Sequence, residues 1–303
     1  MPNVESGHDL TWIAELRDRP VKTGIARRAD GQLVVVETFP AERASIRELT
    51  RTLRTFSALE RLVHPHVVRV RSSWTEGEVL VVQSDYVEGE TLASLFALAA
   101  ERGLRLPVDA ATRIVADVLA GLSALHGVSD VSGQLIDFAH GEIAPRNVVI
   151  GIDGRARVAH PCRPGADPTR SARLALPYMA PEALSEGTIN VRTDVYGAGA
   201  VLFQALDGAP PFDPNRIGIL ASHARGVVRR STPPPADTWA TPLSTIAAKA
   251  MASEPHERYA SASEMAAELR RATTTRMASP ARVSEVLEEI AGDSIRRRRE
   301  RLG

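Results

Sequence analysis

The sequence is poor in cysteine and in long apolar runs, and each shortage excludes a class of protein. Cys162 is the only cysteine, so no internal disulfide can form and a reducing compartment is expected. No apolar run reaches the roughly 18 residues of a membrane span. The polar, acidic start MPNVESGHDL does not resemble a signal peptide. We therefore expect a cytoplasmic protein without a membrane span.

Lysine is also scarce: of the 37 Lys and Arg residues, only Lys22 and Lys249 are lysines. The formal net charge is zero, which gives no global reason to expect a nucleic acid partner. The basic run Arg296–Arg299 could contact an anionic partner, but a solvated helix end is the simpler interpretation. The apolar and charged fractions, 44% and 24%, are those of a globular chain.

The first third of the chain has the pattern of β-strands around one helix. The helix is predicted over 42–63, where apolar residues recur at helical spacing. Alternating or continuous apolar runs predict strands over 11–16, 22–28, 33–39, 66–74 and 79–86. The expected order is therefore β-β-β-α-β-β.

The rest of the chain is mostly helical in pattern. A short hairpin is predicted over 147–160, with its turn at Asp153-Gly154. The stretch 208–238 is rich in Pro and Gly and is expected to be loop with one short helix. Helices are predicted over 91–103, 108–127, 191–208, 242–254 and 261–273, with one or two more over 281–302. A β-rich part followed by a helical part predicts an α+β fold.

Several local motifs follow this layout in order: RLVHPHVVRV, DYVEGETL, HGEIAPRNVVI, MAPEAL, DVYGAGAVLFQAL and EPHERYAS. Together they resemble the protein kinase fold across about residues 9 to 275. The resemblance is greatest to bacterial Ser/Thr kinases of the myxobacterial type, which also lengthen the stretch before the catalytic loop, here 128–139. It implies a bilobal fold with four parts: a tail (1–8), a small lobe (9–86), a helical lobe (87–275) and a helical extension (276–303).

The resemblance places several nucleotide-binding positions on residues of the wrong chemistry. The strand Lys that should neutralise the α and β phosphates falls at Glu37, which reverses the charge. Its partner, a Glu of the regulatory helix, falls near Thr55. The hinge between the lobes falls at Asp85, Tyr86 and Val87.

The catalytic loop keeps its frame but changes its chemistry. His140 and Asn147 stand at the expected separation, while Gly141 replaces an Arg, and Ala144 stands where many kinases have Lys. Glu142 replaces the Asp that accepts the substrate proton. Its extra methylene moves the carboxylate by about 1 Å, and such a misplacement can cost on the order of 100-fold in rate.

The metal-binding Asp that should follow the hairpin falls at His160, a poor ligand for Mg²⁺. No intact metal site is therefore expected. His160, Cys162 and Glu142 could suggest a transition-metal site, but two ligands from adjacent loops without a third at proper spacing are more often coincidence.

The architectural positions match the family: His140, Glu182 of the A-P-E motif, Asp194, and Arg258, which should pair with Glu182. The family resemblance, together with the loss of the nucleotide-binding, catalytic and metal-binding residues, predicts a pseudokinase. Such a protein would be a catalytically inactive regulatory or scaffolding module of bacterial Ser/Thr kinase signalling. Its expected partner is a protein, such as an active kinase or that kinase's substrate, and no cofactor is expected.

Two alternatives stay open. The chain could be an active or weakly active Ser/Thr kinase that uses Lys22 as a substitute phosphate-binding cation and Glu142 as base, with ATP and Mg²⁺. It could also be a nucleotide sensor that binds ATP without transferring phosphate.

Overall fold

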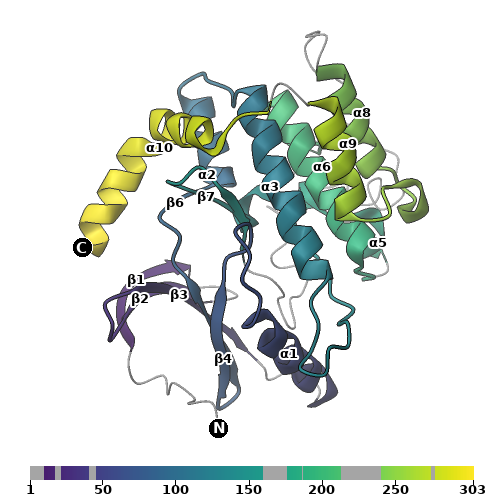
Figure 1. Cartoon of the computed structure of the whole chain (residues 1–303). Helices are drawn as coiled ribbons and strands as arrows, with labels where there is room; N and C mark the ends of the chain where they lie inside the picture. Colours follow the sequence, from purple (N-terminus) through teal and green to yellow (C-terminus); the bar gives the residue numbers. More distant parts are fainter. Residues whose placement is uncertain are drawn as a thin grey trace.

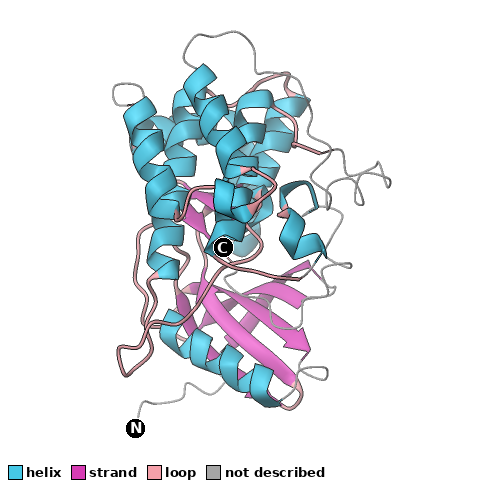
Figure 2. Ribbon diagram, turned by 90° about the vertical axis from the view of Figure 1, so that its right-hand side faces the viewer, coloured by secondary structure: helices cyan, strands magenta, loops and turns pink. Residues whose placement is uncertain are grey.

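The structure is a computed structural model that describes residues 10–17, 22–40, 46–159, 176–185, 187–212, 240–273 and 277–303. Its two lobes lie one above the other, with a sheet in the lower lobe and helices in the upper (Figures 1 and 2). This is the predicted α+β, bilobal arrangement. Within the described residues, no helix combines the length and apolar character needed to cross a membrane.

The small lobe is a five-stranded antiparallel sheet with one helix, α1 (Ile46–Leu59), packed on it. The strands pair in the order β1-β2-β3-β5-β4. Their bounds are β1 (Leu10–Arg17), β2 (Lys22–Arg28), β3 (Leu33–Pro40), β4 (Val70–Glu76) and β5 (Val79–Asp85). The predicted order β-β-β-α-β-β is confirmed.

Two boundaries in this lobe differ from the prediction. The helix α1 ends at Leu59 instead of residue 63. The predicted strand over 66–74 begins only at Val70. Residues before Val70 pair elsewhere, because Val67 forms a bridge with Val158 and the N–H of Val68 donates to the Val158 carbonyl. Their apolar pattern is therefore satisfied by the large lobe and not by β5.

The large lobe is built around two buried helices, α3 (Val108–His126) and α6 (Val191–Asp207). Its small sheet has the order β6-β7-β8. The other elements are β6 (Gly89–Thr91), α2 (Leu92–Glu101), β7 (Val148–Gly151), β8 (Ala156–Val158), α5 (Pro181–Ser185), α8 (Ala240–Ala250), α9 (Ala262–Ala272) and α10 (Pro280–Leu302).

The strand β6 was not predicted. Its three residues are polar or glycine and form a strand only because they pair with β7. The predicted loop over 208–238 lies outside the described residues from 213 onward. The last helical segment is one helix, α10, which begins at a Ser279 cap with Pro280 in its first turn. Figure 1 shows α10 running from the helical lobe down beside β6 toward the small lobe.

Two glycines let the backbone of α6 approach its neighbours: Gly197 faces the loop around Ile143, and Gly199 faces α8. A Cβ on Gly197 would lie 2.7 Å from the Ile143 carbonyl oxygen, and one on Gly199 would lie 2.6 Å from Ala250 Cβ. Both contacts are closer than real Cβ atoms allow. The loop around Ile143 therefore rests directly on the α6 backbone, which positions the site described next.

Candidate functional site: a kinase-like loop with altered charges

The loop that begins at His140 is anchored by one buried carboxylate at the start of α6. Asp194 is 1% exposed. Its oxygens accept hydrogen bonds from the backbone N–H groups of His140 (2.8 Å) and Gly141 (2.7 Å) and from His126 Nε2 (2.8 Å). Gly141 has φ of +78°, a conformation that glycine adopts without strain. The Arg expected at that position would be strained in this loop.

His140 and Asn147 hold the two ends of the loop together. His140 Nε2 donates to the Ala159 carbonyl (2.9 Å), and its Nδ1 accepts from the N–H of Glu142 (3.2 Å), so the proton sits on Nε2. Asn147 is 1% exposed, and its amide donates to the Glu142 carbonyl at 2.7 Å. The backbone carbonyl of Asn147 accepts a hydrogen bond from the backbone N–H of Ala159 (2.9 Å). Asn147 therefore orders its own loop.

The carboxylate of Glu142 is engaged by a cation of the same loop. Arg146 Nη2 lies 3.1 Å from Glu142 Oε2, with the two side chains 11% and 17% exposed. Ala144, the position of a Lys in many kinases, is 1% exposed and belongs to the apolar core. The loop is thus held in a kinase-like frame, but its acidic group is charge-compensated by Arg146.

Glu37 lies on the buried, large-lobe side of the small sheet. It is 3% exposed, and in the strand register it stands between Thr23 and Val82. Side chains alternate along a strand, so Glu37 shares its face with Phe39, which belongs to the same core as α1. Lys22 pairs with Thr38 and therefore lies on the opposite face. Its side chain is exposed.

Thr55, near which the resemblance places the regulatory-helix Glu, lies on α1 and carries no charge. It is 6% exposed, and its hydroxyl donates to the Arg51 carbonyl one turn earlier (3.0 Å). The described structure therefore contains no Lys–Glu ion pair between the Glu37 and Thr55 positions.

The hinge residues Asp85, Tyr86 and Val87 border a groove of about 730 Å³ that also includes the end of α10. Asp85 forms an ion pair with Arg71. Burial raises the pKa of the Tyr86 hydroxyl, although the charge and hydrogen bond of Arg298 on α10 oppose the shift. The C-terminal end of α10 therefore lies beside the hinge and contacts it through Arg298 and Arg299.

The expected pair of Arg258 and Glu182 is present and buried. The guanidinium donates Nη1 to Glu182 Oε1 (2.7 Å) and Nη2 to Oε2 (2.8 Å), and the Arg258 side chain is 0% exposed. Thr193 donates a further hydrogen bond to Glu182 Oε1 (3.0 Å). This pair joins α5 to the segment before α9.

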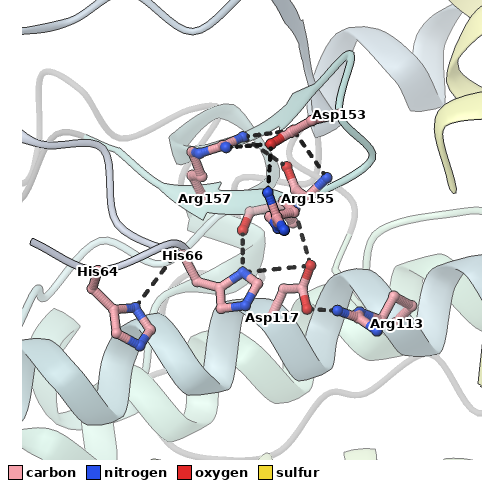
Figure 3. Close-up of polar contacts among 8 residues, drawn as sticks. His64, His66, Arg113, Asp117, Asp153, Arg155 and Arg157 are labelled. Carbon is pink, nitrogen blue, oxygen red and sulfur yellow. Dashed lines mark hydrogen bonds and ion pairs between the residues drawn. The ribbon is translucent and has the colours of Figure 1, made fainter. Parts of the chain in front are cut away.

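A polar network at the junction of the lobes was missed by the sequence analysis (Figure 3). Asp117 of α3 accepts from Arg113 Nε (2.8 Å) and from the N–H of Ala156 (3.1 Å). His66 Nδ1 donates to the Ala156 carbonyl (3.0 Å) and lies 3.5 Å from Asp117. Burial raises the pKa of Asp117, while His66 and Arg113 oppose that shift. A lone Asp in an apolar helix was the only signal available.

Gly121 makes this junction possible, because a Cβ there would lie 2.2 Å from the His66 carbonyl oxygen. The segment between α1 and β4 can therefore rest against α3. His160 and Cys162, the remaining metal candidates, lie outside the described residues. Among the residues that are described, no three His, Cys, Asp or Glu side chains are grouped to hold a metal ion.

The two-lobed fold, the anchored loop and the buried Glu182–Arg258 pair define a protein of the kinase class. The chain belongs to the protein kinase domain family, whose model matches residues 21–269.

Named relatives agree with this family. The serine/threonine-protein kinase PkaA of Streptomyces coelicolor is 31% identical over 254 residues, covering 82% of this chain and 44% of that protein. The tyrosine-protein kinase MasK of Myxococcus xanthus is 25% identical, over 68% of this chain and 33% of its own. PkaB of Streptomyces coelicolor is 28% identical, over 86% and 58%. This chain therefore spans less than three fifths of the length of each of these relatives.

Solved structures agree on the fold. The crystal structure of the Mycobacterium tuberculosis PknI kinase domain covers 87% of this chain and 96% of its own, with a TM-score of 0.62 and 22% identity. A second structure of that domain gives a TM-score of 0.65 at 21% identity. At this identity the likeness concerns the fold alone.

Proposed function

We propose that this chain is a pseudokinase domain: a kinase fold that does not transfer phosphate and acts as a regulatory or scaffolding module. The observation that carries the proposal is Glu37, a buried carboxylate at the strand position where the family resemblance expects the phosphate-neutralising Lys. A like-charge contact costs roughly 1 kcal/mol or more near a surface, so Glu37 opposes binding of a triphosphate.

The surrounding residues support the same conclusion. Phosphoryl transfer depends on positioning and charge neutralisation, so each missing cation removes part of the mechanism. Thr55 supplies no charge, and the carboxylate of Glu142 faces Arg146 at 3.1 Å. The Glu142 carboxylate is therefore engaged within its own loop by Arg146, at the position where the family resemblance expects the base. The site keeps His140 and Asn147, which hold the loop in its conformation.

The alternative that uses Lys22 as the phosphate-binding cation is disfavoured by the strand register. Lys22 emerges from the sheet face opposite that of Glu37, so its ammonium group would have to cross the sheet to reach a nucleotide beside Glu37. The nucleotide-sensor alternative needs a cationic site for phosphate as well, and Glu37 counts against it for the same reason.

Several relatives are named serine/threonine-protein kinases. We therefore place the proposed role in Ser/Thr kinase signalling, with a protein as partner and no bound cofactor required. The fold alone does not assign kinase activity, since function follows from the chemistry of the site.

A thermal-shift titration with ATP, alone and with Mg²⁺ or Mn²⁺, tests this proposal. A ligand at 100 times its dissociation constant raises the free energy of unfolding by about 2.7 kcal/mol, so real binding is readily measured. We expect no shift with either metal. A metal-dependent shift that disappears in Lys22→Ala would contradict the proposed loss of nucleotide binding and would show that Lys22 takes part in that binding.

Radiolabelled phosphate transfer to a generic substrate separates the other outcomes. We expect no incorporation, and we expect Glu142→Gln to match the wild type in both assays. Nucleotide binding without incorporation would instead establish the sensor. Incorporation that Glu142→Gln abolishes would establish a working catalytic base.

A further inference from the structure

The stretch between α3 and the kinase-like loop contains a small hairpin organised by one side chain. The backbone closes through Asp130 N–H to the Gln134 carbonyl (2.9 Å) and Ile136 N–H to the Val128 carbonyl (2.9 Å). Asp130 Oδ1 accepts from the N–H groups of Ser132 (2.8 Å) and Gln134 (3.1 Å) and from the Ser132 hydroxyl (2.6 Å). We call residues 128–136 the brace hairpin.

The brace hairpin belongs to the large lobe by chain connection, but it contacts the helix of the small lobe. Arg54 of α1 forms an ion pair with Asp130 Oδ2 and lies 3.4 Å from Gln134 Oε1. Arg61, just beyond the end of α1, donates to the Ser129 carbonyl at 2.9 Å. In Figure 1 the loop after α3 descends to the level of α1, and Figure 2 shows loop segments reaching α1 from the helical lobe.

The two contacts fasten α1 at two places, one within the helix and one just past its end. Arg54 lies inside α1, Arg61 lies two residues beyond Leu59, and both reach the same hairpin. The carboxylate of Asp130 is already committed to its charged form. The Ser132 hydroxyl and then Arg54 hold the pKa of Asp130 far below its ordinary value. The anchoring charge is therefore present across the physiological pH range.

Inside the molecule, Glu37 and Thr55 stand where the family resemblance expects a Lys–Glu ion pair between β3 and this helix. We propose that the brace hairpin holds α1 against the large lobe from the outside and thereby fixes the position of the helix relative to that lobe. On the small-lobe side, the Ser73 hydroxyl of β4 donates to the Glu60 carboxylate (2.7 Å), just past the end of the helix. The consequence is a helix held in one position without nucleotide.

Hydrogen exchange of the α1 backbone, measured by mass spectrometry on the whole chain without nucleotide, tests this proposal. We expect the double variant Arg54→Ala/Arg61→Ala to exchange about three- to tenfold faster in α1, because exposed ion pairs and hydrogen bonds each contribute modestly. Exchange in α3 and α6 should stay as in the wild type. Arg51→Ala is the matched control, since Arg51 is an exposed arginine one turn earlier in α1.

Asp130→Asn separates the brace from the hairpin's own turn. Its amide oxygen can still accept the Ser132 and Gln134 N–H groups, but it no longer carries the charge that pairs with Arg54. We expect faster exchange in α1 and an unchanged hairpin. Equal exchange in the double variant and in Arg51→Ala, or a uniform increase through both lobes, would overturn the proposal. The readout involves no nucleotide, so it stands or falls independently of the proposed loss of catalysis.

Discussion

The buried pair of Arg258 and Glu182 should be the most sensitive ion pair described in this structure. Arg258→Ala removes two hydrogen bonds to the carboxylate and those to the carbonyls of Ala252 (2.8 Å), Ser253 (2.9 Å) and Arg192 (3.1 Å). It leaves Glu182 buried with the hydrogen bond from the Thr193 hydroxyl but without its cation. Removing one partner of a buried ion pair costs about 3–5 kcal/mol. That is a large share of the roughly 5–15 kcal/mol that stabilises a typical domain.

Urea unfolding followed by circular dichroism measures this loss. Arg271→Ala is the control, because the Arg271–Glu268 pair is 71% and 41% exposed and should contribute less than about 1 kcal/mol. Arg258→Lys keeps the charge but loses the two-pronged geometry, so an intermediate loss is expected. If Arg258→Ala and Arg271→Ala lost the same free energy of unfolding, the assignment of this pair as a structural anchor would be refuted.

The same pair makes a pH-dependent contribution. Burial by itself would raise the pKa of Glu182, but the hydrogen bonds from Arg258 bring it below its ordinary value of 4.5 on balance. The contribution is therefore complete above about pH 4.5 and is lost as the pH falls through the folded-state pKa. The free energy of unfolding of the wild type exceeds that of Arg258→Ala, and this difference should become smaller as the pH falls below about 4.5. A difference that stayed constant under acid conditions would contradict this account.

Two further predictions concern the docking of α10. Gly154→Ala places a Cβ 1.8 Å from the Pro280 carbonyl oxygen, so it should lower the free energy of unfolding by clearly more than Gly31→Ala. Both glycines have positive φ, but Gly31 has open space, so its substitution should cost only about 1–2 kcal/mol. Arg298→Ala leaves the Glu90 carboxylate, which is 3% exposed, without its 2.7 Å partner, and should cost about 2–4 kcal/mol in the same assay. Losses no greater than that of Gly31→Ala would show that α10 is not firmly docked.

The predictions from sequence succeeded in two cases: where an element depends on neighbours along the chain, and where the family resemblance named a distant partner. Short β-like runs bounded by turn residues located β2, β3 and β5 closely, and the runs of β3 and β5 are continuously apolar at their start. The match to motif spacing identified Glu182 and Arg258 as partners, although they are 76 residues apart. That inference came from the family resemblance, since nothing local to either residue identifies its partner.

Other features could not be read along the chain, because they depend on which distant backbone comes close. The strand β6 exists only through its pairing with β7, and Val67 is drawn from its expected strand to Val158. Asp117 becomes a junction residue only because Gly121 admits the His66 carbonyl beside α3. Each of these follows from packing between elements.

The sequence by itself determined the α+β layout and the charge chemistry of the site, since replacing a Lys by Glu37 or an Asp by Glu142 is visible in any conformation. Only the tertiary structure decided which charges meet. It placed Lys22 on the far face of the sheet, paired Glu142 with Arg146, and brought Arg54 to Asp130 across 76 residues of chain. The physical reason is that electrostatic interactions act at distances of a few ångströms, and those distances are set by packing.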